Sequence, residues 1–197
     1  MKRLLIATTN PGKLVEFRDL LGDLAVELVL PERDLQVVEN GRSYAENAAL
    51  KAHAYAAASG LTALADDSGL EVDALDGAPG LYSARYSPDE NASDADRRAL
   101  LLANLQAKPR PWTAHFHCTL AVAQPDGSVH YTQGNVYGEI LPEERGNNGF
   151  GYDPLFLLPE LGRTMAELTR EEKNTLSHRA LAVHAAQPYL QELLRLR

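Results

Sequence analysis

The chain has 197 residues, of which 45% are hydrophobic and 23% charged, and its formal net charge is −8. This length is enough for a domain with a buried core, and the acidic surplus argues against a protein that binds nucleic-acid backbones. Cys118 is the single cysteine, which excludes an intrachain disulfide. Residues 1–7 lack a signal-peptide pattern and no apolar run reaches the roughly 20 residues of a membrane span. We therefore expect a cytoplasmic protein.

The first half of the chain alternates between predicted strands and helices. Short apolar runs predict strands, and apolar residues at helical spacing predict helices. In chain order we expect a strand at 4–7, a helix at 13–21, a strand at 26–30, a helix at 43–59 that ends at Gly60, and a strand at 61–65.

The second half of the chain contains a strong hairpin signal. Pro125, Asp126 and Gly127 lie between two β-prone runs, 112–123 and 128–141. We also expect a helix at 92–105, a loop at 147–154 and a last helix at 175–196 that Pro188 kinks or divides. Interleaved helices and strands with a hairpin indicate an α/β protein with a mixed sheet, read as a single domain over 1–197.

The segment from Thr8 to Lys13 is the first candidate for binding phosphate. Asn10 suits a helix N-cap, and Pro11 suits the first helical position. A helix that starts here offers free N–H groups and the positive end of its dipole, which favour a phosphate beside Thr8, Thr9 and Asn10. Lys13 adds a cation. No Walker A pattern is present, and the alternative is an ordinary strand-to-helix turn.

Two further polar clusters follow. Asn47 and Lys51 share one face of an alanine-rich helix and either line a ligand site or belong to a solvated face. Asp66 and Asp67 follow a strand, where carboxylates suit Mg²⁺. Neighbouring strand residues point to opposite faces, so only one is expected to be the principal metal or base residue. The alternative for these aspartates, with Ser68, is a helix cap or an Asx-turn.

The last candidates lie near the C-terminal end of the chain. Glycines around Phe150 allow a ligand to approach the backbone, and a base can stack on its ring; otherwise Phe150 and Tyr152 are core residues. His178 and Arg179 carry donors that match a purine keto oxygen, the alternative being a charged helix start. His115 and His117 share a strand face, where a structural role is favoured over zinc.

These pieces together resemble the inosine triphosphate pyrophosphatase family, also called dITP/XTP pyrophosphatases. The resemblance runs from residue 8 to residue 179. It is carried by Thr8–Lys13, Glu46–Ala48 with Lys51, the stretch Ala65–Leu75, Gly77–Gly80 with Tyr82–Tyr86, Gly149–Pro154, Ala166–Leu168, Glu171–Asn174 and Ser177–Arg179.

The resemblance implies a role for each matching position. Asp67 would be the proton acceptor and a Mg²⁺ ligand, with Glu39 as a second metal carboxylate. The triphosphate would be held by Thr8, Thr9, Asn10, Lys13 and Lys51. Base, sugar and phosphate would be contacted by Ser68, Phe150, Gly151, Tyr152, Asp153, Lys173, His178 and Arg179. It also implies a homodimer and an active site in the cleft between two lobes around a long mixed sheet.

The implied reaction is hydrolysis of ITP, dITP and XTP to the monophosphate and pyrophosphate, by attack of water on the α-phosphorus with Mg²⁺. The departures from the family pattern are Asp76 and Ala180, where glycine is usual, and the stretch around Glu39, where many relatives have two consecutive acids. Two rivals are a pyrophosphatase of pyrimidine triphosphates, which the His178–Arg179 pair disfavours, and a nucleotide sensor without turnover, which Asp67 and Lys13 disfavour.

Overall fold

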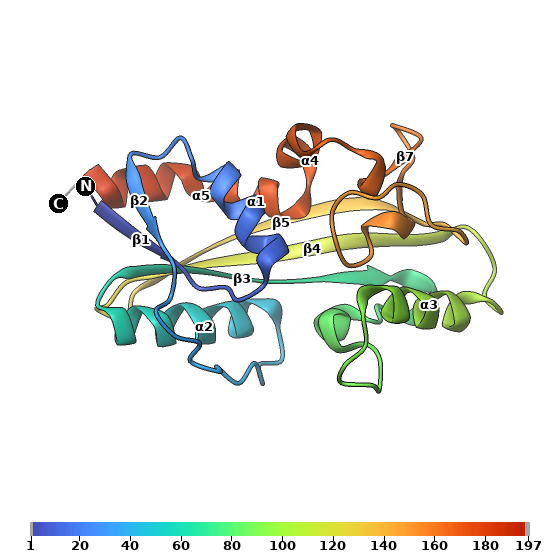
Figure 1. Cartoon of the computed structure of the whole chain (residues 1–197), viewed down its shortest axis with the longest axis horizontal. Coiled ribbons are helices and arrows are strands. Elements are labelled where there is room, and N and C mark those ends of the chain that lie inside the picture. Colours follow the sequence, from blue (N-terminus) through green and yellow to red (C-terminus); the bar gives the residue numbers. More distant parts are fainter. Residues whose placement is uncertain (1, 196–197) are drawn as a thin grey trace. The chain divides into compact units, whose positions relative to one another are not determined.

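The computed structural model describes residues 2–195 (Figure 1). Its elements in chain order are β1 (Lys2–Ile6), α1 (Pro11–Leu20), β2 (Val26–Val29), α2 (Tyr44–Ser59), β3 (Thr62–Val72), η1 (Asp73–Leu75), η2 (Gly80–Arg85), α3 (Asp94–Leu105), β4 (Trp112–Ala123), β5 (Val129–Ile140), η3 (Asp153–Leu155), β6 (Phe156–Leu158), β7 (Arg163–Thr164), η4 (Met165–Glu167), α4 (Arg170–Leu176) and α5 (His178–Arg195).

Within the described residues, seven strands form one mixed sheet in the order β2-β1-β3-β4-β5-β6-β7. β1 pairs in parallel with β2 and β3, whereas β6 pairs antiparallel with β5 and β7. The predicted hairpin joins β4 to β5, and the Gln124 N–H donates to the Ser128 carbonyl oxygen across its turn at 2.9 Å. The predicted α/β fold with a mixed sheet is therefore confirmed.

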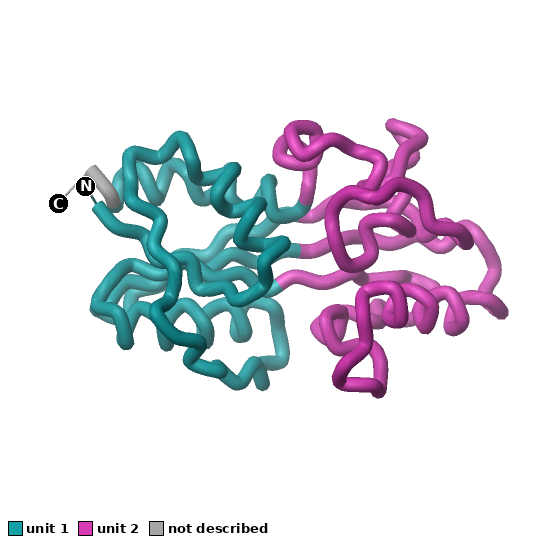
Figure 2. Tube along the Cα trace, viewed as in Figure 1, with its two compact units in different colours: residues 1–67, 118–134, 178–197 teal, residues 68–117, 135–177 magenta. Residues whose placement is uncertain are grey.

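The chain divides into two compact units (Figure 2). Unit 1 comprises Met1–Asp67, Cys118–Gly134 and His178–Arg197, and unit 2 comprises Ser68–His117 and Asn135–Ser177. The first boundary falls inside β3, between Asp67 and Ser68.

In unit 1 the sheet has a helical layer on each face. Leu64 of β3 belongs to a buried cluster that includes Phe17 of α1 and Val183 of α5. Its neighbours Ala63 and Ala65 belong to a second cluster, with alanines of α2 (Figure 1). Because side chains alternate along a strand, Asp66 lies on the same face of β3 as Leu64, and Asp67 lies on the same face as Ala65.

Unit 2 has its own apolar core. Leu70 and Val72 of β3 are buried together with Leu101 and Leu105 of α3. Further core side chains come from β4, β5 and the segment that follows, among them Trp112, Phe116, Val136, Ile140, Tyr152 and Phe156. The phenyl rings of Phe116 and Phe156 lie 4.5 Å apart between centroids. This core supports the loop before η3.

Two sequence predictions about local structure are wrong. The strand expected at 61–65 does not end before Asp66, because β3 continues as an extended strand to Val72. The Asx-turn alternative for Asp66 and Asp67 is thereby excluded. The tertiary contacts of the strand outweigh the local preference of these residues for a turn.

The last helix was expected to start at residue 175. The chain instead forms α4 and breaks at Ser177, whose ψ of 154° is extended, before α5 starts at His178. α5 continues past Pro188 without being divided. The predicted end at Leu196 lies outside the described residues.

Candidate active site

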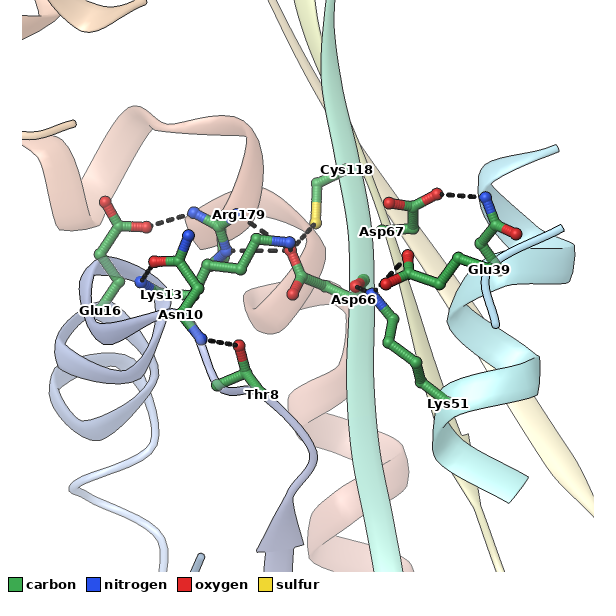
Figure 3. Close-up of polar contacts among 11 residues, drawn as sticks. Thr8, Asn10, Lys13, Glu16, Glu39, Lys51, Asp66, Asp67, Cys118 and Arg179 are labelled. Atoms are coloured by element: carbon green, nitrogen blue, oxygen red, sulfur yellow. Dashed lines mark hydrogen bonds and ion pairs between the residues drawn. The ribbon is translucent and has the colours of Figure 1, made fainter. Parts of the chain in front are cut away.

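The turn between β1 and α1 forms an N-capped helix start, as predicted. The Asn10 side chain accepts from the Lys13 N–H at 3.1 Å, and Pro11 occupies the first turn. Thr8 Oγ1 accepts from the Asn10 N–H at 3.2 Å (Figure 3). Thr9 and Asn10 are exposed. The segment is therefore pre-shaped, with the positive end of a helix dipole at a solvent-accessible turn.

Asp66 lies in a buried cluster of opposite charges. Its Oδ2 accepts from Arg179 Nη2 at 2.9 Å and lies 3.1 Å from Lys13 Nζ. Arg179 is also buried, and its Nη1 donates to Glu16 of α1. Figure 3 shows Asp66, Lys13, Arg179 and Glu16 on one side of β3. Removing one member of a buried ion pair leaves an uncompensated charge, which strongly destabilises the fold. Each charge in this cluster therefore needs its partners.

The pKa of the Asp66 carboxyl follows from this pairing. Burial alone raises it, but the positive charges of Lys13, Arg179 and Lys51 outweigh burial and hold the pKa far below its ordinary value. The Oδ1 atom of Asp66 is buried and has no hydrogen-bond partner among the described residues. Asp66 is thus a permanently ionised carboxylate that organises cations and takes no proton at neutral pH.

Asp67 has different surroundings on the other side of β3 (Figure 3). It is buried, and its Oδ2 accepts from Asn47 Nδ2 of α2 at 3.0 Å. Burial raises its pKa, assisted by the negative charge of Glu39, and the lysines and Asn47 offset this only in part. A carboxylate with a raised pKa is a stronger base than an ordinary aspartate, which suits a proton acceptor.

Lys51 of α2 contacts the backbone of β3 at Asp66 and the carboxylate of Glu39. Its Nζ donates to the backbone carbonyl of Asp66 at 2.6 Å and lies 3.0 Å from Glu39 Oε2. The alternative of a solvated helix face is therefore wrong for Asn47 and Lys51, because both side chains point at β3.

The residues around Asp67 suit a divalent cation. Mg²⁺ in nucleotide sites takes one or two carboxylates and completes its ligand set with water and substrate phosphates. Glu39 and Asp67 provide two carboxylates whose mutual repulsion contributes to the raised pKa of Asp67. A cation between them would relieve that repulsion. Among the described residues no three His, Cys, Asp or Glu side chains form a metal-binding group.

In unit 2 the predicted loop forms a second candidate site. Asp153 Oδ2 accepts from the Phe150 N–H at 2.9 Å and from Lys173 Nζ at 2.6 Å, and both charged residues are buried. Lys173 Nζ lies 5.0 Å from the centroid of the half-exposed Phe150 ring. Gly149 has φ +75°, and a Cβ there would lie 2.0 Å from Asp153 Oδ2. Glycine is therefore required for this close packing.

The structure also places the remaining predicted site residues, Tyr152, Gly151, Ser68 and His178. Tyr152 is buried and its hydroxyl donates to the Ser83 carbonyl oxygen at 2.9 Å, so it anchors the loop in the core. Gly151 is a central residue of the same loop, and Ser68 follows Asp67 on β3. His178 is buried at the first position of α5.

The surroundings of Cys118 do not suit a nucleophile. It is fully buried, its Sγ lies 3.8 Å from Asp66 Oδ2, and burial raises the pKa of the thiol. A neutral, enclosed thiol is a poor nucleophile.

Sequence reasoning singled out Asn47 and Asp66 without giving either a definite role, and it missed Glu16. In the structure Asn47 donates to Asp67, and Asp66 and Glu16 both accept from Arg179. One signal for Glu16 was available, since it lies three residues after Lys13 on α1. Nothing in the sequence pairs Arg179 with Glu16.

These features define an α/β protein with a capped, solvent-accessible helix start and a pair of carboxylates, Glu39 and Asp67, at the neighbouring strand. The sequence pattern of the Ham1 family matches residues 4–189, and the chain belongs to this family.

Similar proteins agree with this assignment over nearly the whole chain. A dITP/XTP pyrophosphatase of Listeria monocytogenes serotype 4b is 47% identical over 98% of this chain and 97% of its own length. One from Geobacter sulfurreducens is 49% identical over 96% and 97%. A solved HAM1 protein structure from Coxiella burnetii superimposes with a TM-score of 0.87 at 40% identity, over 98% of this chain and 100% of that one.

Proposed function

We propose that this protein hydrolyses dITP, XTP and ITP to the nucleoside monophosphate and pyrophosphate. The relatives named above carry the name dITP/XTP pyrophosphatase at 47–49% identity. The observation that carries the proposal is the difference in surroundings between two adjacent aspartates on β3. Asp66 is neutralised by cations, whereas the pKa of Asp67 is raised.

The phosphate end of the substrate is assigned to the start of α1. Thr8, Thr9 and Asn10 present the helix N-terminus, where N–H groups and the helix dipole favour an anion. Lys13 and Lys51 supply positive charge that stabilises the leaving pyrophosphate as its negative charge develops.

Asp67 is the proposed proton acceptor. It takes the proton of the water that attacks the α-phosphorus, and Asn47 fixes its orientation through the 3.0 Å hydrogen bond. Glu39 and Asp67 would hold Mg²⁺. The cation, when bound, lowers the pKa of a bound water and neutralises phosphate charge.

The base end of the substrate is assigned to the Phe150 loop and His178. The Phe150 ring offers a stacking face, and Asp153 and Lys173 present a charged pair behind it. Gly151 and Tyr152 shape this loop, and Ser68 contacts the substrate beside Asp67. A donor from His178 matches the six-keto oxygen of inosine and xanthine. The amino group of adenine at that position leaves the donor unmatched.

Arg179 has contacts that favour a role different from the predicted one. Sequence reasoning assigned its guanidinium to the purine keto oxygen. In the structure that guanidinium is 1% exposed and binds Asp66 and Glu16. We propose that Arg179 holds Asp66 ionised and so helps to place Lys13, leaving recognition of the base to His178.

Three further expectations remain proposals. A homodimer and a substrate site in a cleft between two lobes rest on the family resemblance, whereas a cytoplasmic location rests on the sequence composition. No helix among the described residues is long and apolar enough to cross a membrane. Light scattering tests the dimer: a mass of 21.5 kDa, that of one chain, at micromolar concentration would contradict it.

A panel of triphosphates tests the function. The protein is incubated with Mg²⁺ and ITP, dITP, XTP, ATP or CTP, and the nucleotide and phosphate products are separated. We expect rapid conversion of the first three to monophosphate and pyrophosphate. Equal rates on ATP, or nucleotide binding without turnover, would contradict the proposal.

A further inference from the structure

Helix α3 holds the centre of the loop Gly149–Asp153. The Gly151 N–H donates to Asp94 Oδ2 at 2.7 Å, and the Gly151 carbonyl oxygen accepts from Arg98 Nη1 at 2.8 Å. Asp94 and Arg98 lie one turn apart on the same face of α3. Two charged side chains therefore fix both peptide groups that flank the Cα of Gly151.

These two charged residues are themselves held in place. Arg97 Nη2 lies 2.5 Å from Asp94 Oδ1, and Arg98 makes a two-point ion pair with Glu144 at 2.8 and 3.0 Å. Burial alone would raise the pKa of Asp94, but hydrogen bonds from Arg97 and the Gly151 N–H lower it below the ordinary value. Asp94 is therefore ionised at neutral pH, and charge-assisted hydrogen bonds are the stronger kind.

Packing does not explain the conformation of Gly151. Its φ is +62°, and a Cβ built there would meet no atom within 4 Å. Glycine can leave this region easily, since it has access to conformations on both sides of φ = 0. The two hydrogen bonds from α3 therefore hold the peptide groups of Gly151 directly, in addition to the 3.3 Å hydrogen bond from the Asp153 N–H to the Phe150 carbonyl oxygen that closes the turn.

We propose that Asp94 and Arg98 are positioning residues for purine recognition, because they hold the peptide groups between Phe150 and Asp153. This inference rests on the proposed function, which assigns the loop to the base. The hydrogen bonds and ion pairs of Asp94 and Arg98 described above all lie within unit 2. Their loss should therefore weaken binding of the base and leave the hydrolytic step nearly unchanged.

Two probes separate the base from the phosphates. Calorimetry measures the affinity of the purified full-length protein for IMP, which has the base, and for inorganic pyrophosphate, which lacks it. We expect Arg98→Gln to weaken IMP binding by about tenfold, the factor for loss of one charge-assisted hydrogen bond. Pyrophosphate affinity should stay within about twofold. In turnover, KM for ITP should rise by a similar factor while kcat changes little.

Two further variants complete the design. Arg98→Lys keeps a charged donor and should restore part of the IMP affinity. Asp96→Ala is the control, because Asp96 caps the same helix through Ser93 and is not among the contacts of Gly151. It should lower thermal stability without the selective loss of IMP affinity.

Three outcomes would overturn the inference. IMP affinity could stay unchanged in Arg98→Gln, IMP and pyrophosphate could weaken equally, or Asp96→Ala could reproduce the selective loss. Failure of the proposed function gives a different result: wild-type protein would bind IMP and release no pyrophosphate from ITP.

Discussion

Asp66 and Asp67 are neighbours on β3, but only the conversion of Asp66 to asparagine should destabilise the fold. The raised pKa of Asp67 means that its ionised carboxylate is disfavoured in the folded state relative to the unfolded chain. At pH 7 the carboxyl is ionised in the unfolded chain, so this cost is fully present. Asp67→Asn removes it while keeping the side-chain shape. We expect a melting temperature equal to that of wild type, or higher.

Asp66→Asn should destabilise the protein strongly. The lowered pKa of Asp66 shows that its ionised form stabilises the fold at any pH above its unfolded value near 3.9, and that this contribution is lost as the pH falls below it. Removing one member of a buried ion pair costs about 3–5 kcal/mol, because Arg179 is left without one of its two carboxylates. For a chain of this length that corresponds to a fall of roughly 6–20 °C in melting temperature.

The same variants are also compared in their rate of hydrolysis. Loss of a general base lowers kcat by about 10²–10⁴-fold, so Asp67→Asn should be stable and nearly inactive. Thermal melting and initial rates on ITP with saturating Mg²⁺ are measured for wild type and both variants. A destabilised Asp67→Asn whose rate stays within a few-fold of wild type would refute the reasoning and make Asp67 a structural residue.

Two other substitutions test the geometry elsewhere. Asp76 has φ +52°, where a non-glycine residue costs roughly 1 kcal/mol, so Asp76→Gly should raise the melting temperature by about 2–4 °C; an unchanged or lower value would count against that strain. Gly149→Ala should abolish IMP binding, because its Cβ would overlap Asp153 Oδ2, whereas Gly162→Ala, at φ +63° with no atom within 4 Å, should keep it. Similar IMP affinities in the two alanine variants would contradict the packing argument.

Much of the fold could be predicted from local sequence signals. Asn10 and Pro11 mark the start of α1, and Ser43 and Gly60 delimit α2 through a side-chain cap and a left-handed residue. The Pro-Asp-Gly turn places β4 and β5. In each case the deciding interaction lies within a few residues along the chain, which is the range that sequence patterns describe well.

The errors arise where distant residues decide the structure. Asp66 and Asp67 look like turn residues, but cations and an amide from α1, α2 and α5 stabilise them within an extended strand. The break at Ser177, which separates α4 from α5, had no proline or glycine to mark it. Asp76, where the family pattern has glycine, adopts the left-handed conformation at the C-terminal end of η1.

The candidate site could likewise be predicted where local signals decide it, and not where distant residues do. The alternation of side chains along a strand correctly predicted that Asp66 and Asp67 face opposite ways (Figure 3). It could not say which of them meets the cations, because that depends on Arg179, 113 positions along the chain from Asp66. The role predicted for Arg179 followed from its residue type, whereas its contacts with Asp66 and Glu16 depend on the fold and support the different role proposed above.

The central claim is that water attacks the α-phosphorus of the triphosphate while Asp67 accepts its proton. Hydrolysis of ITP in water enriched with ¹⁸O, followed by mass spectrometry of the separated products, tests it most directly. We expect one ¹⁸O atom in IMP and none in pyrophosphate. Label in pyrophosphate, or release of labelled orthophosphate as the first product, would show attack at a different phosphorus and contradict the account.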